Sequence, residues 1–418
     1  MSSTVVVVGQ GYVGLPLAMR AVEVGYRVVG VDLDLDRIGG LLAGSSYVDD
    51  VTDEALRAAS DSGRYRVTAD YDEIGEAFDV AVITVPTPLR DGLPDLSFVE
   101  SASRSLSGRL RHGATVILES TTYPGTTEEL VVPLLEHGSG LRAGRDFHVG
   151  YSPERIDPGN RKWGFVETPK VVSGIDAASL AAVTRFYDDL VLRTVPVSGT
   201  REAELTKLLE NTFRHVNVAL VNELAVFAHR LGVDVWEAID AASTKPFGFM
   251  RFTPGPGVGG HCLPIDPSYL SWQVRRQLGQ PFRFVDLAND VNEHMPDHVV
   301  ERVQSMLNDC SRSVRGSRVL LVGLAYKKNS GDVREAPALK IAQSLLQQGA
   351  EVVAVDPHVH ERYWPEGIRR VDLVRDVVAE VDAAVVVTDH DGVDLSLLHG
   401  VPTFDTRHVL TGDHVVAL

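Results

Sequence analysis

The feature that most constrains the fold is a run of four valines that leads directly into a glycine motif. Residues 5–8 are all valine, and Gly9, Gly11 and Gly14 follow as G-x-G-x-x-G. An apolar run of this kind is typical of a strand buried on both faces, and a helical pattern begins near Val13. The chain is therefore predicted to open with a strand, a tight turn and a helix, the first step of a parallel α/β sheet.

The same alternation of strands and helices occurs towards both ends of the chain. Apolar runs predict strands at 5–9, 27–32, 80–86, 115–120, 318–323, 351–356 and 383–388, with a helix near 337–348. Residues 201–240 have apolar side chains at mostly helical spacing, which indicates one long helix or two in series. We predict an α/β fold of two Rossmann-like doubly wound domains joined by a long central helix region, divided as 1–198, 199–298 and 299–418.

Composition argues against several classes of protein. A length of 418 residues favours two or three domains. A formal net charge of −17 disfavours non-specific nucleic-acid binding and a polybasic membrane contact. No export signal opens the chain, and no apolar run of about 18 residues predicts a membrane span. The two cysteines, Cys262 and Cys310, form no disulfide framework. These features predict a cytoplasmic protein.

The glycine motif and Asp32 together predict a dinucleotide site. Gly9 would let the chain turn, Gly11 would let the backbone approach a pyrophosphate, and Gly14 would let helix and strand pack closely. Asp32 ends the second predicted strand. Its carboxylate would accept hydrogen bonds from ribose hydroxyls and repel a 2′-phosphate, which favours NAD over NADP. The alternative is that the glycines form only a tight turn.

Three charged residues follow Asp32. Arg37 would lie either against the adenine or ribose or at the surface. Asp34 and Asp36 are expected to be solvated loop charges.

A second candidate site is the segment 253–267, which is dense in proline and glycine and is predicted to be neither helix nor strand. It contains Cys262, four residues before Asp266. A thiol is nucleophilic only as the thiolate, so this role requires a nearby cation such as His261 or Lys207, or a positive dipole. The alternative for a lone cysteine is a small buried apolar residue, which is what we expect of Cys310.

The long helix contributes polar candidates. Lys207 and Asn211 lie four residues apart and hence on one face, with Glu210 between them. They would either find buried partners or lie on a solvated face. Asn222 and Glu223 are expected to be solvated.

Seven ordered segments connect the chain to a known family. They are the glycine motif, 85–88 (VPTP), 119–125 (ESTTYPG), 151–155 (YSPER), Lys207 with Asn211, 259–266 (GGHCLPID), and 323–327 (GLAYK) with 332–334 (DVR). With these segments the sequence resembles the UDP-glucose/UDP-N-acetylhexosamine 6-dehydrogenases over nearly its whole length. It is most similar to the UDP-N-acetylglucosamine and UDP-N-acetylmannosamine branch.

The resemblance implies an NAD-dependent enzyme that oxidises the C6 hydroxymethyl of a UDP-sugar to a carboxylate in two hydride transfers, as used in polysaccharide biosynthesis. The active site would lie between the two Rossmann-like domains, in a dimer or higher homo-oligomer built around the central helix. Cys262 would carry a thioester. Asp266, with Lys207, Asn211 and a water, would deprotonate the sugar hydroxyl and hold the oxyanion.

The resemblance also implies contacts for the remaining matched residues. Thr121 and Glu154 would lie in the catalytic pocket, with Glu154 as a base for thioester hydrolysis. Arg334 would hold the cofactor or the nucleotide phosphates. NAD would be contacted by Gly9, Gly11, Tyr12, Val13, Gly14, Asp32, Arg37, Pro86, Thr87, Thr121 and Arg334. The UDP-sugar would be contacted by Glu154, Arg155, Lys207, Asn211, Arg251, Gly260, His261 and Lys327. No metal is implied.

Departures from the UDP-glucose branch bear on the substrate. Pro158 stands where that branch tends to carry a further acid, and Ile265 replaces a lysine common there. Together with 155–160 and 245–249 they favour an N-acetylhexosamine over glucose. The rivals are a two-electron β-hydroxyacid-type dehydrogenase, which has no use for Cys262, and a non-catalytic NAD-binding module.

Overall fold

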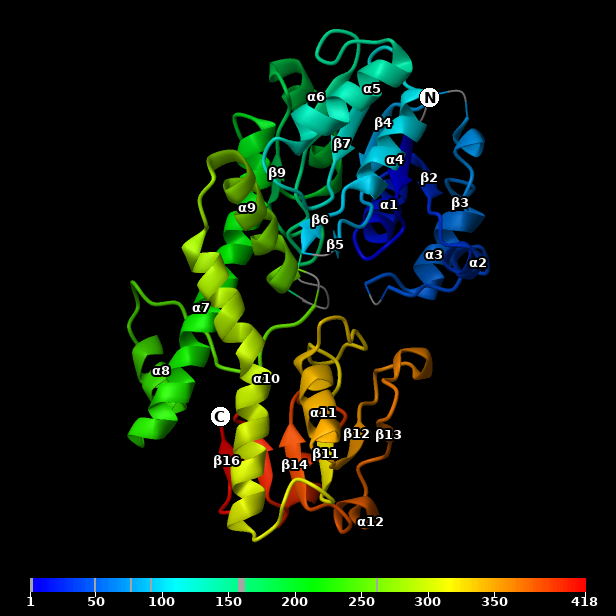
Figure 1. Cartoon of the computed structure of the whole chain (residues 1–418). Coiled ribbons are helices and arrows are strands. Elements are labelled where there is room, and N and C mark those ends of the chain that lie inside the picture. The colour runs from blue at the N-terminus through cyan, green and yellow to red at the C-terminus, as the bar shows by residue number, and fades with distance from the viewer. Residues whose placement is uncertain (1–2, 49, 76, 91, 157–161, 261) are drawn as a thin grey trace. The chain divides into compact units, whose positions relative to one another are not determined.

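Figure 1 shows the computed structural model, which describes residues 3–48, 50–75, 77–90, 92–156, 162–260 and 262–418, without the side chain of Cys262. The chain forms two compact units, Met1–Glu210 and Asn211–Leu418, called unit 1 and unit 2 below. In the described residues no helix is long and apolar enough to cross a membrane. The same residues contain no group of acidic, histidine or cysteine side chains suited to a metal ion.

Unit 1 is built on a parallel sheet of six strands in the order β3-β2-β1-β4-β7-β8. The strands are β1 (Thr4–Val8), β2 (Arg27–Val31), β3 (Tyr65–Thr68), β4 (Val80–Ile83), β7 (Thr115–Leu118) and β8 (His148–Tyr151). Because side chains alternate along a strand, Val5 and Val7 pack with Leu15 of α1 and Phe186 of α6 in one apolar cluster. The sheet is therefore the buried layer of a doubly wound fold.

Helices and short strands complete unit 1. The helices are α1 (Gly14–Glu23), α2 (Leu35–Leu42), α3 (Asp53–Asp61), α4 (Ser97–Ser107), α5 (Val132–Ser139) and α6 (Ala177–Leu190), with single turns η1 (Tyr71–Ile74) and η2 (Thr127–Val131). Two small ribbons pair β5 (Leu89–Arg90) with β6 (Leu93–Pro94), and β9 (Lys170–Val172) with β10 (Thr194–Pro196).

The 32-residue helix α7 (Thr200–Leu231) starts in unit 1 and continues into unit 2. Its first turn is fixed within unit 1 by Glu204, whose buried carboxylate accepts hydrogen bonds from the Gly125 N–H at 2.5 Å and the Thr127 N–H at 2.9 Å. α8 (Val235–Ser243) follows in series, as expected from the helical pattern of 201–240. The next helices are α9 (Cys262–Leu278) and α10 (Arg283–Asp309).

Unit 2 has its own parallel sheet of six strands in the order β13-β12-β11-β14-β15-β16. The strands are β11 (Arg318–Val322), β12 (Glu351–Val355), β13 (Arg369–Arg370), β14 (Ala383–Val386), β15 (Thr403–Asp405) and β16 (Val415–Ala417). Helices α10 and α11 (Pro337–Gln347) pack together against this sheet (Figure 1). α12 (Arg375–Val378), η3 (Glu361–Tyr363) and η4 (Leu395–Leu398) complete the unit.

The predicted α/β class with two Rossmann-like halves and a long helix is confirmed, and each predicted strand is present with its end shifted by at most a few residues. The prediction for residues 253–267 was partly wrong. The loop expected over 253–267 is only partly a loop, because helix α9 begins at Cys262. Pro264 lies in the first turn of this helix, where a missing N–H costs nothing, and Pro267 lies inside the helix. Proline therefore did not mark a loop there.

Candidate active site

The three glycines after β1 differ in what surrounds them. A Cβ on Gly14 would lie 1.8 Å from the Gly9 carbonyl oxygen, and a Cβ on Gly9, which has φ +93°, would lie 2.7 Å from the Thr84 oxygen. Those two glycines are required by the fold itself. A Cβ on Gly11 would meet no atom of the described residues within 4 Å. The backbone at Gly11 is therefore open to a ligand at the N-terminus of α1, next to Tyr12 and Val13.

Asp32 directly follows β2 and is held by the adjacent turn. Its carboxylate accepts hydrogen bonds from the Gln10 N–H at 2.8 Å, the Arg37 guanidinium at 2.9 Å and the Asp34 N–H at 3.0 Å. The Arg37 guanidinium also lies over the Tyr47 ring, 5.1 Å from its centre. Asp34 is more than the solvated charge we expected, since it caps the N-terminus of α2.

Gln10, between the first two glycines, is a buried residue to which the sequence assigned no role. Its Nε2 donates to the Val7 carbonyl at 2.9 Å, and its Oε1 accepts from the Tyr65 hydroxyl at 2.8 Å. A Cβ on Gly30 would lie 2.5 Å from the Gln10 side chain. These contacts of Gln10 hold the turn formed by residues 9–14, called the glycine turn below, against β2 and β3.

Other predicted site residues follow the carboxyl ends of neighbouring strands in the same sheet. Pro86 and Thr87 come after β4, Thr121 after β7 and Glu154 after β8. The Ser120 hydroxyl donates to the Val85 carbonyl at 2.7 Å and so ties two of these segments together. Ligands of open α/β sheets bind at this edge.

Glu154 is nearly buried, and its carboxylate is well satisfied. It accepts hydrogen bonds from the Arg155 N–H at 2.6 Å, the Ile156 N–H at 2.7 Å and the Lys170 ammonium at 2.9 Å. The Arg155 guanidinium instead forms an ion pair with Glu210, with a shortest contact of 2.6 Å. Burial would raise the pKa of Glu154, but Lys170 and the other donors hold it well below its usual range.

In unit 2, two of the predicted catalytic residues are in direct contact. The Asn211 amide nitrogen on α7 donates a hydrogen bond to the Asp266 carboxylate, which lies near the start of α9. Lys207 precedes Asn211 by one turn of α7 and belongs to unit 1. The helix spacing seen in the sequence therefore identified a residue with a partner in α9.

The segment before Cys262 is fixed by a residue that we expected to be solvated. Asn222 is fully buried in unit 2. Its side chain accepts from the Gly255 N–H at 2.9 Å and donates to Asn292 at 2.8 Å. It therefore joins α7 and α10 to the start of the segment that leads to Cys262, residues 253–260, called the cysteine loop below. Asn222 is polar, and α7 also exposes many apolar side chains. The burial of Asn222 could therefore not be predicted from the spacing of apolar residues in the sequence.

The glycines of this loop make room for the chain itself. A Cβ on Gly260 would lie 2.7 Å from the Tyr326 ring, and one on Gly259 would lie 2.9 Å from the Glu335 carbonyl oxygen. The Gly260 N–H donates to the Arg334 carbonyl at 2.9 Å. The cysteine loop and the segment that carries Lys327 and Arg334 are therefore neighbours within unit 2.

The remaining candidates have local surroundings. The Arg334 guanidinium pairs with Asp332 at 2.6 Å, and that of Arg251 pairs with Asp240 at 2.7 Å. Cys310, expected to be buried, is exposed because it caps the C-terminus of α10. His261 and the side chain of Cys262 lie outside the described residues.

Unit 2 has an acid, Asp356, that follows β12 as Asp32 follows β2. Its carboxylate accepts hydrogen bonds from the Leu324 and Ala325 N–H groups at 2.8 and 2.9 Å and contacts the ring of His390 at 3.0 Å. Since the Asn329 N–H donates to the other ring nitrogen of His390, the nitrogen facing Asp356 is assigned the hydrogen. Asp356 therefore holds the backbone of Leu324 and Ala325, at the start of the loop that leads to Lys327.

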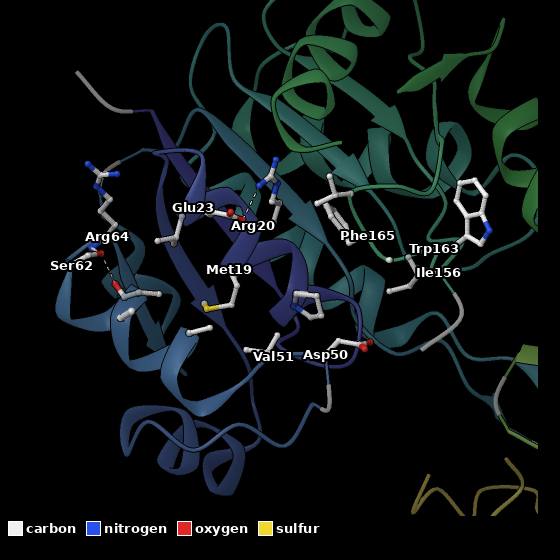
Figure 2. A pocket seen from close by; sticks show the side chains of 17 residues that line it. Met19, Arg20, Glu23, Asp50, Val51, Ser62, Arg64, Ile156, Trp163 and Phe165 are labelled. Carbon is white, nitrogen blue, oxygen red and sulfur yellow. Dashed lines mark hydrogen bonds and ion pairs between the residues drawn. The ribbon is translucent and has the colours of Figure 1, made fainter. Parts of the chain in front are cut away.

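A pocket of about 600 Å³ lies elsewhere in unit 1, between α1, α3 and the segment 163–166 (Figure 2). Its lining is mainly apolar, with Met19, Val51 and Phe165 turned towards it and the ion pair of Arg20 and Glu23 at 2.8 Å on α1. None of the predicted site residues whose side chains the structure describes lines this pocket.

Comparison with known proteins identifies the family over most of the chain. Residues 3–191, 201–294 and 320–412 match the NAD binding, central and UDP binding domains of the UDP-glucose/GDP-mannose dehydrogenase family. The chain is 36% identical to UDP-N-acetyl-D-mannosamine dehydrogenase of Pyrococcus horikoshii over 92% of this chain and 89% of that one. It is 38% identical to UDP-N-acetyl-D-glucosamine 6-dehydrogenase of Pseudomonas aeruginosa over 85% and 83% of the two chains.

Among solved structures, a UDP-glucose dehydrogenase from Pyrobaculum islandicum matches with a TM-score of 0.87 and 28% identity over 100% of this chain and 97% of that one. The chain belongs to the UDP-glucose/GDP-mannose dehydrogenase family. It is an NAD-dependent dehydrogenase, and its substrate is a UDP-sugar.

Proposed function

We propose that the protein is a UDP-N-acetylhexosamine 6-dehydrogenase that forms a thioester on Cys262. The observation that carries the proposal is the contact between Asn211 and Asp266 at the helix that Cys262 opens. A cysteine at a helix N-terminus is favoured as the thiolate, the form that attacks an aldehyde.

The first oxidation would use the polar groups around that helix. Asp266, Asn211 and Lys207 would act through a water to take the proton of the C6 hydroxyl, while a hydride leaves C6 for NAD⁺. The Lys207 ammonium would stabilise the developing alkoxide, an effect that is largest where water is excluded. Gly11 and Asp32 would contact the cofactor, at the turn that Gly9 and Gly14 shape.

The second oxidation would proceed on the enzyme. The Cys262 sulfur would bond to the aldehyde carbon, and a second NAD⁺ would take the hydride from the resulting hemithioacetal. Water would then attack the thioester, forming a C–O bond and releasing the thiolate. Glu154 would accept the proton of that water, with Thr121 beside it in the pocket. The covalent step would keep the aldehyde from escaping.

The substrate would be UDP-N-acetylglucosamine or UDP-N-acetylmannosamine, with UDP-glucose as the alternative. The names of the Pyrococcus horikoshii and Pseudomonas aeruginosa relatives support the first two, as does Pro158 in place of the acid typical of the UDP-glucose branch. Contacts with the UDP-sugar would come from Arg155, Arg251, Gly260, His261 and Lys327. Arg334 and the main-chain turn at Pro86 and Thr87 would contact the nucleotides.

The chain would divide into domains at 1–198, 199–298 and 299–418.

The protein would assemble as a homodimer built on α7. A row of exposed apolar side chains at helical spacing in unit 2 supports this assembly. The row consists of Phe213, Leu220, Leu224, Phe227 and Leu231. An apolar row of this length is typical of an interface. Leu220→Asp combined with Phe227→Asp should therefore give a monomer by sedimentation, whereas an unchanged mass would contradict this assembly.

The cytoplasm would be the site of action, because the reaction consumes NAD⁺ and uses a free thiol.

The test of the thioester compares the two cysteines. Cys262→Ser should lose nearly all steady-state turnover and form at most a slow ester, because a hydroxyl is a poorer nucleophile than a thiolate. Cys310→Ser should keep the wild-type rate, since Cys310 is exposed at the end of α10. An equal loss in both variants would refute the assignment.

A further inference from the structure

A cluster of buried ionisable side chains surrounds Glu154, and the proposed mechanism uses only that one member. The Lys170 ammonium contacts the carboxylates of both Glu119 and Glu154, the second at 2.9 Å. The Tyr187 hydroxyl donates to the other oxygen of Glu119. Lys170, Glu119 and Tyr187 are 3%, 2% and 0% exposed, so water does not screen their charges.

The sheet topology brings these groups together. Glu119 directly follows β7, Glu154 comes three residues after β8, and β7 pairs in parallel with β8. Lys170 opens β9, and Tyr187 lies on α6. Glu119 is two residues from Thr121, so the cluster lies just beneath the predicted catalytic edge of unit 1.

The charges of the cluster do not balance when both carboxyl groups are ionised. Two carboxylates then share one ammonium, and the Arg155 guanidinium is engaged by Glu210 instead. A net buried charge is costly, and binding one proton removes it. The charged and titratable groups that act on Glu119 are Lys170, Glu154 and Tyr187.

The surroundings indicate which carboxyl takes the proton. Glu154 accepts two backbone N–H groups in addition to Lys170, which stabilises its anion. Glu119 also forms a side-chain hydrogen bond with Glu154, and the Tyr187 hydroxyl beside it can accept a hydrogen bond from a protonated carboxyl as well. Burial raises the pKa of Glu119, against the effect of Lys170, while that of Glu154 is lowered.

We propose that Glu119 and Glu154 act as one base, which works from the form with both carboxyl groups ionised and takes up a single proton, with Glu154 facing the reaction and Glu119 holding the proton afterwards. When water attacks the thioester, its proton passes to Glu154 and then to Glu119, and Lys170 remains paired with the Glu154 carboxylate. The proton later leaves to solvent, so charge and atoms balance over the cycle. Lys170 is a positioning residue that keeps both carboxylates within reach of one proton.

This inference rests on the proposed function, because it gives Glu154 the role of base in hydrolysis. Alone beside Lys170, Glu154 would be too weak a base, since an efficient base has a pKa near the working pH. Paired with an ionised Glu119 it becomes more basic, because a like charge disfavours a second anion.

The experiment follows thioester hydrolysis in the Glu119→Gln variant of the full chain. Protein with UDP-N-acetylglucosamine or UDP-N-acetylmannosamine and NAD⁺ is quenched at successive times, and the covalent adduct is quantified by mass spectrometry from pH 5 to 9. The first NADH should form at the wild-type rate. Adduct decay should slow at least about tenfold, and the acid limb of its pH profile should move to lower pH.

Controls separate the possible failures. Glu129→Gln removes an exposed carboxylate paired with Arg201 and should leave adduct decay unchanged. Tyr187→Phe keeps the packing and should slow decay less than Glu119→Gln does. An unchanged decay rate and pH profile in a folded, NAD-binding Glu119→Gln protein would overturn the inference. Absence of any adduct in the wild type and in Glu154→Gln would instead overturn the proposed thioester.

Discussion

The three glycines of the glycine turn have different roles: Gly9 and Gly14 are needed for the fold, and Gly11 is expected to be needed for cofactor binding. Gly9 and Gly14 are confined by neighbouring backbone, whereas a Cβ on Gly11 would have no atom of the described residues within 4 Å. A side chain added at these positions should therefore act on different properties of the molecule.

Gly11→Ala should fold normally and bind NAD⁺ at least about tenfold more weakly, a change of about 1.4 kcal/mol. Gly14→Ala should lower the free energy of unfolding by about 1–3 kcal/mol or more, because its Cβ would overlap the Gly9 carbonyl. Calorimetric titration and urea unfolding measure the two effects. Loss of stability without loss of NAD⁺ affinity in Gly11→Ala would contradict the role given to this glycine.

The sequence predicted residues whose role depends on local spacing and missed those whose role depends on tertiary contacts. Gly9, Gly14 and Asp32 lie within one strand–turn–helix–strand segment, so their positions could be predicted. Four buried polar side chains have partners 16 to 70 positions away, in addition to the local bonds of Gln10: Gln10, Asn222, Glu119 and Lys170. Such pairings leave no periodic pattern in one sequence.

At the scale of elements, the loop that leads to Cys262 is held from two helices. Asn222 on α7 binds the Gly255 backbone and Asn292 on α10, so one amide connects three segments of unit 2. The loop was predicted from its glycines and prolines. The beginning of α9 was not, because proline in the first turn of a helix has the same local appearance as proline in a loop.

Asn222→Ala should lower the free energy of unfolding by about 1–3 kcal/mol, because it leaves a buried N–H and a buried amide oxygen without partners. Turnover should fall as well, since Gly255 lies in the cysteine loop. The control is Asn217→Ala, whose side chain donates to the Phe213 carbonyl of its own helix and should change stability by less than about 0.5 kcal/mol. Equal stability of the two variants would show that Asn222 is not a structural link.

The loop that carries Lys327 should have a pH dependence of its own. Burial would raise the pKa of Asp356, but His390 and the N–H groups of Leu324 and Ala325 lower it strongly. A lowered pKa in the folded state adds stability above the unfolded value near pH 4, and this stability is lost as the pH falls through the folded value.

Asp356→Asn should therefore be less stable than the wild type at pH 7 by about 1–3 kcal/mol, and the difference should shrink below about pH 4. Thermal unfolding of the full chain at a series of pH values checks this. A difference that grows on acidification would contradict the sign of the shift.

At the scale of the whole molecule, two Rossmann-like units differ in what their matching acids do. Asp32 is within reach of Arg37 and the open glycine turn, whereas Asp356 is enclosed by backbone N–H groups and His390. This agrees with a family in which one domain binds NAD and the other binds UDP. The fold class and family were predictable from ordered motifs, but the fold also fits a UDP-glucose dehydrogenase, so the sugar is decided by pocket side chains.

The central claim is that one polypeptide removes four electrons from one sugar through Cys262. The most direct test is the ratio of NADH formed to sugar consumed, with UDP-N-acetylglucosamine, UDP-N-acetylmannosamine and UDP-glucose offered separately to the wild type and to Cys262→Ala. We expect two NADH per sugar with an N-acetylhexosamine substrate, and loss of this yield in the variant. One NADH per sugar, unaffected by the loss of Cys262, would mean a simple two-electron dehydrogenase and would contradict the account.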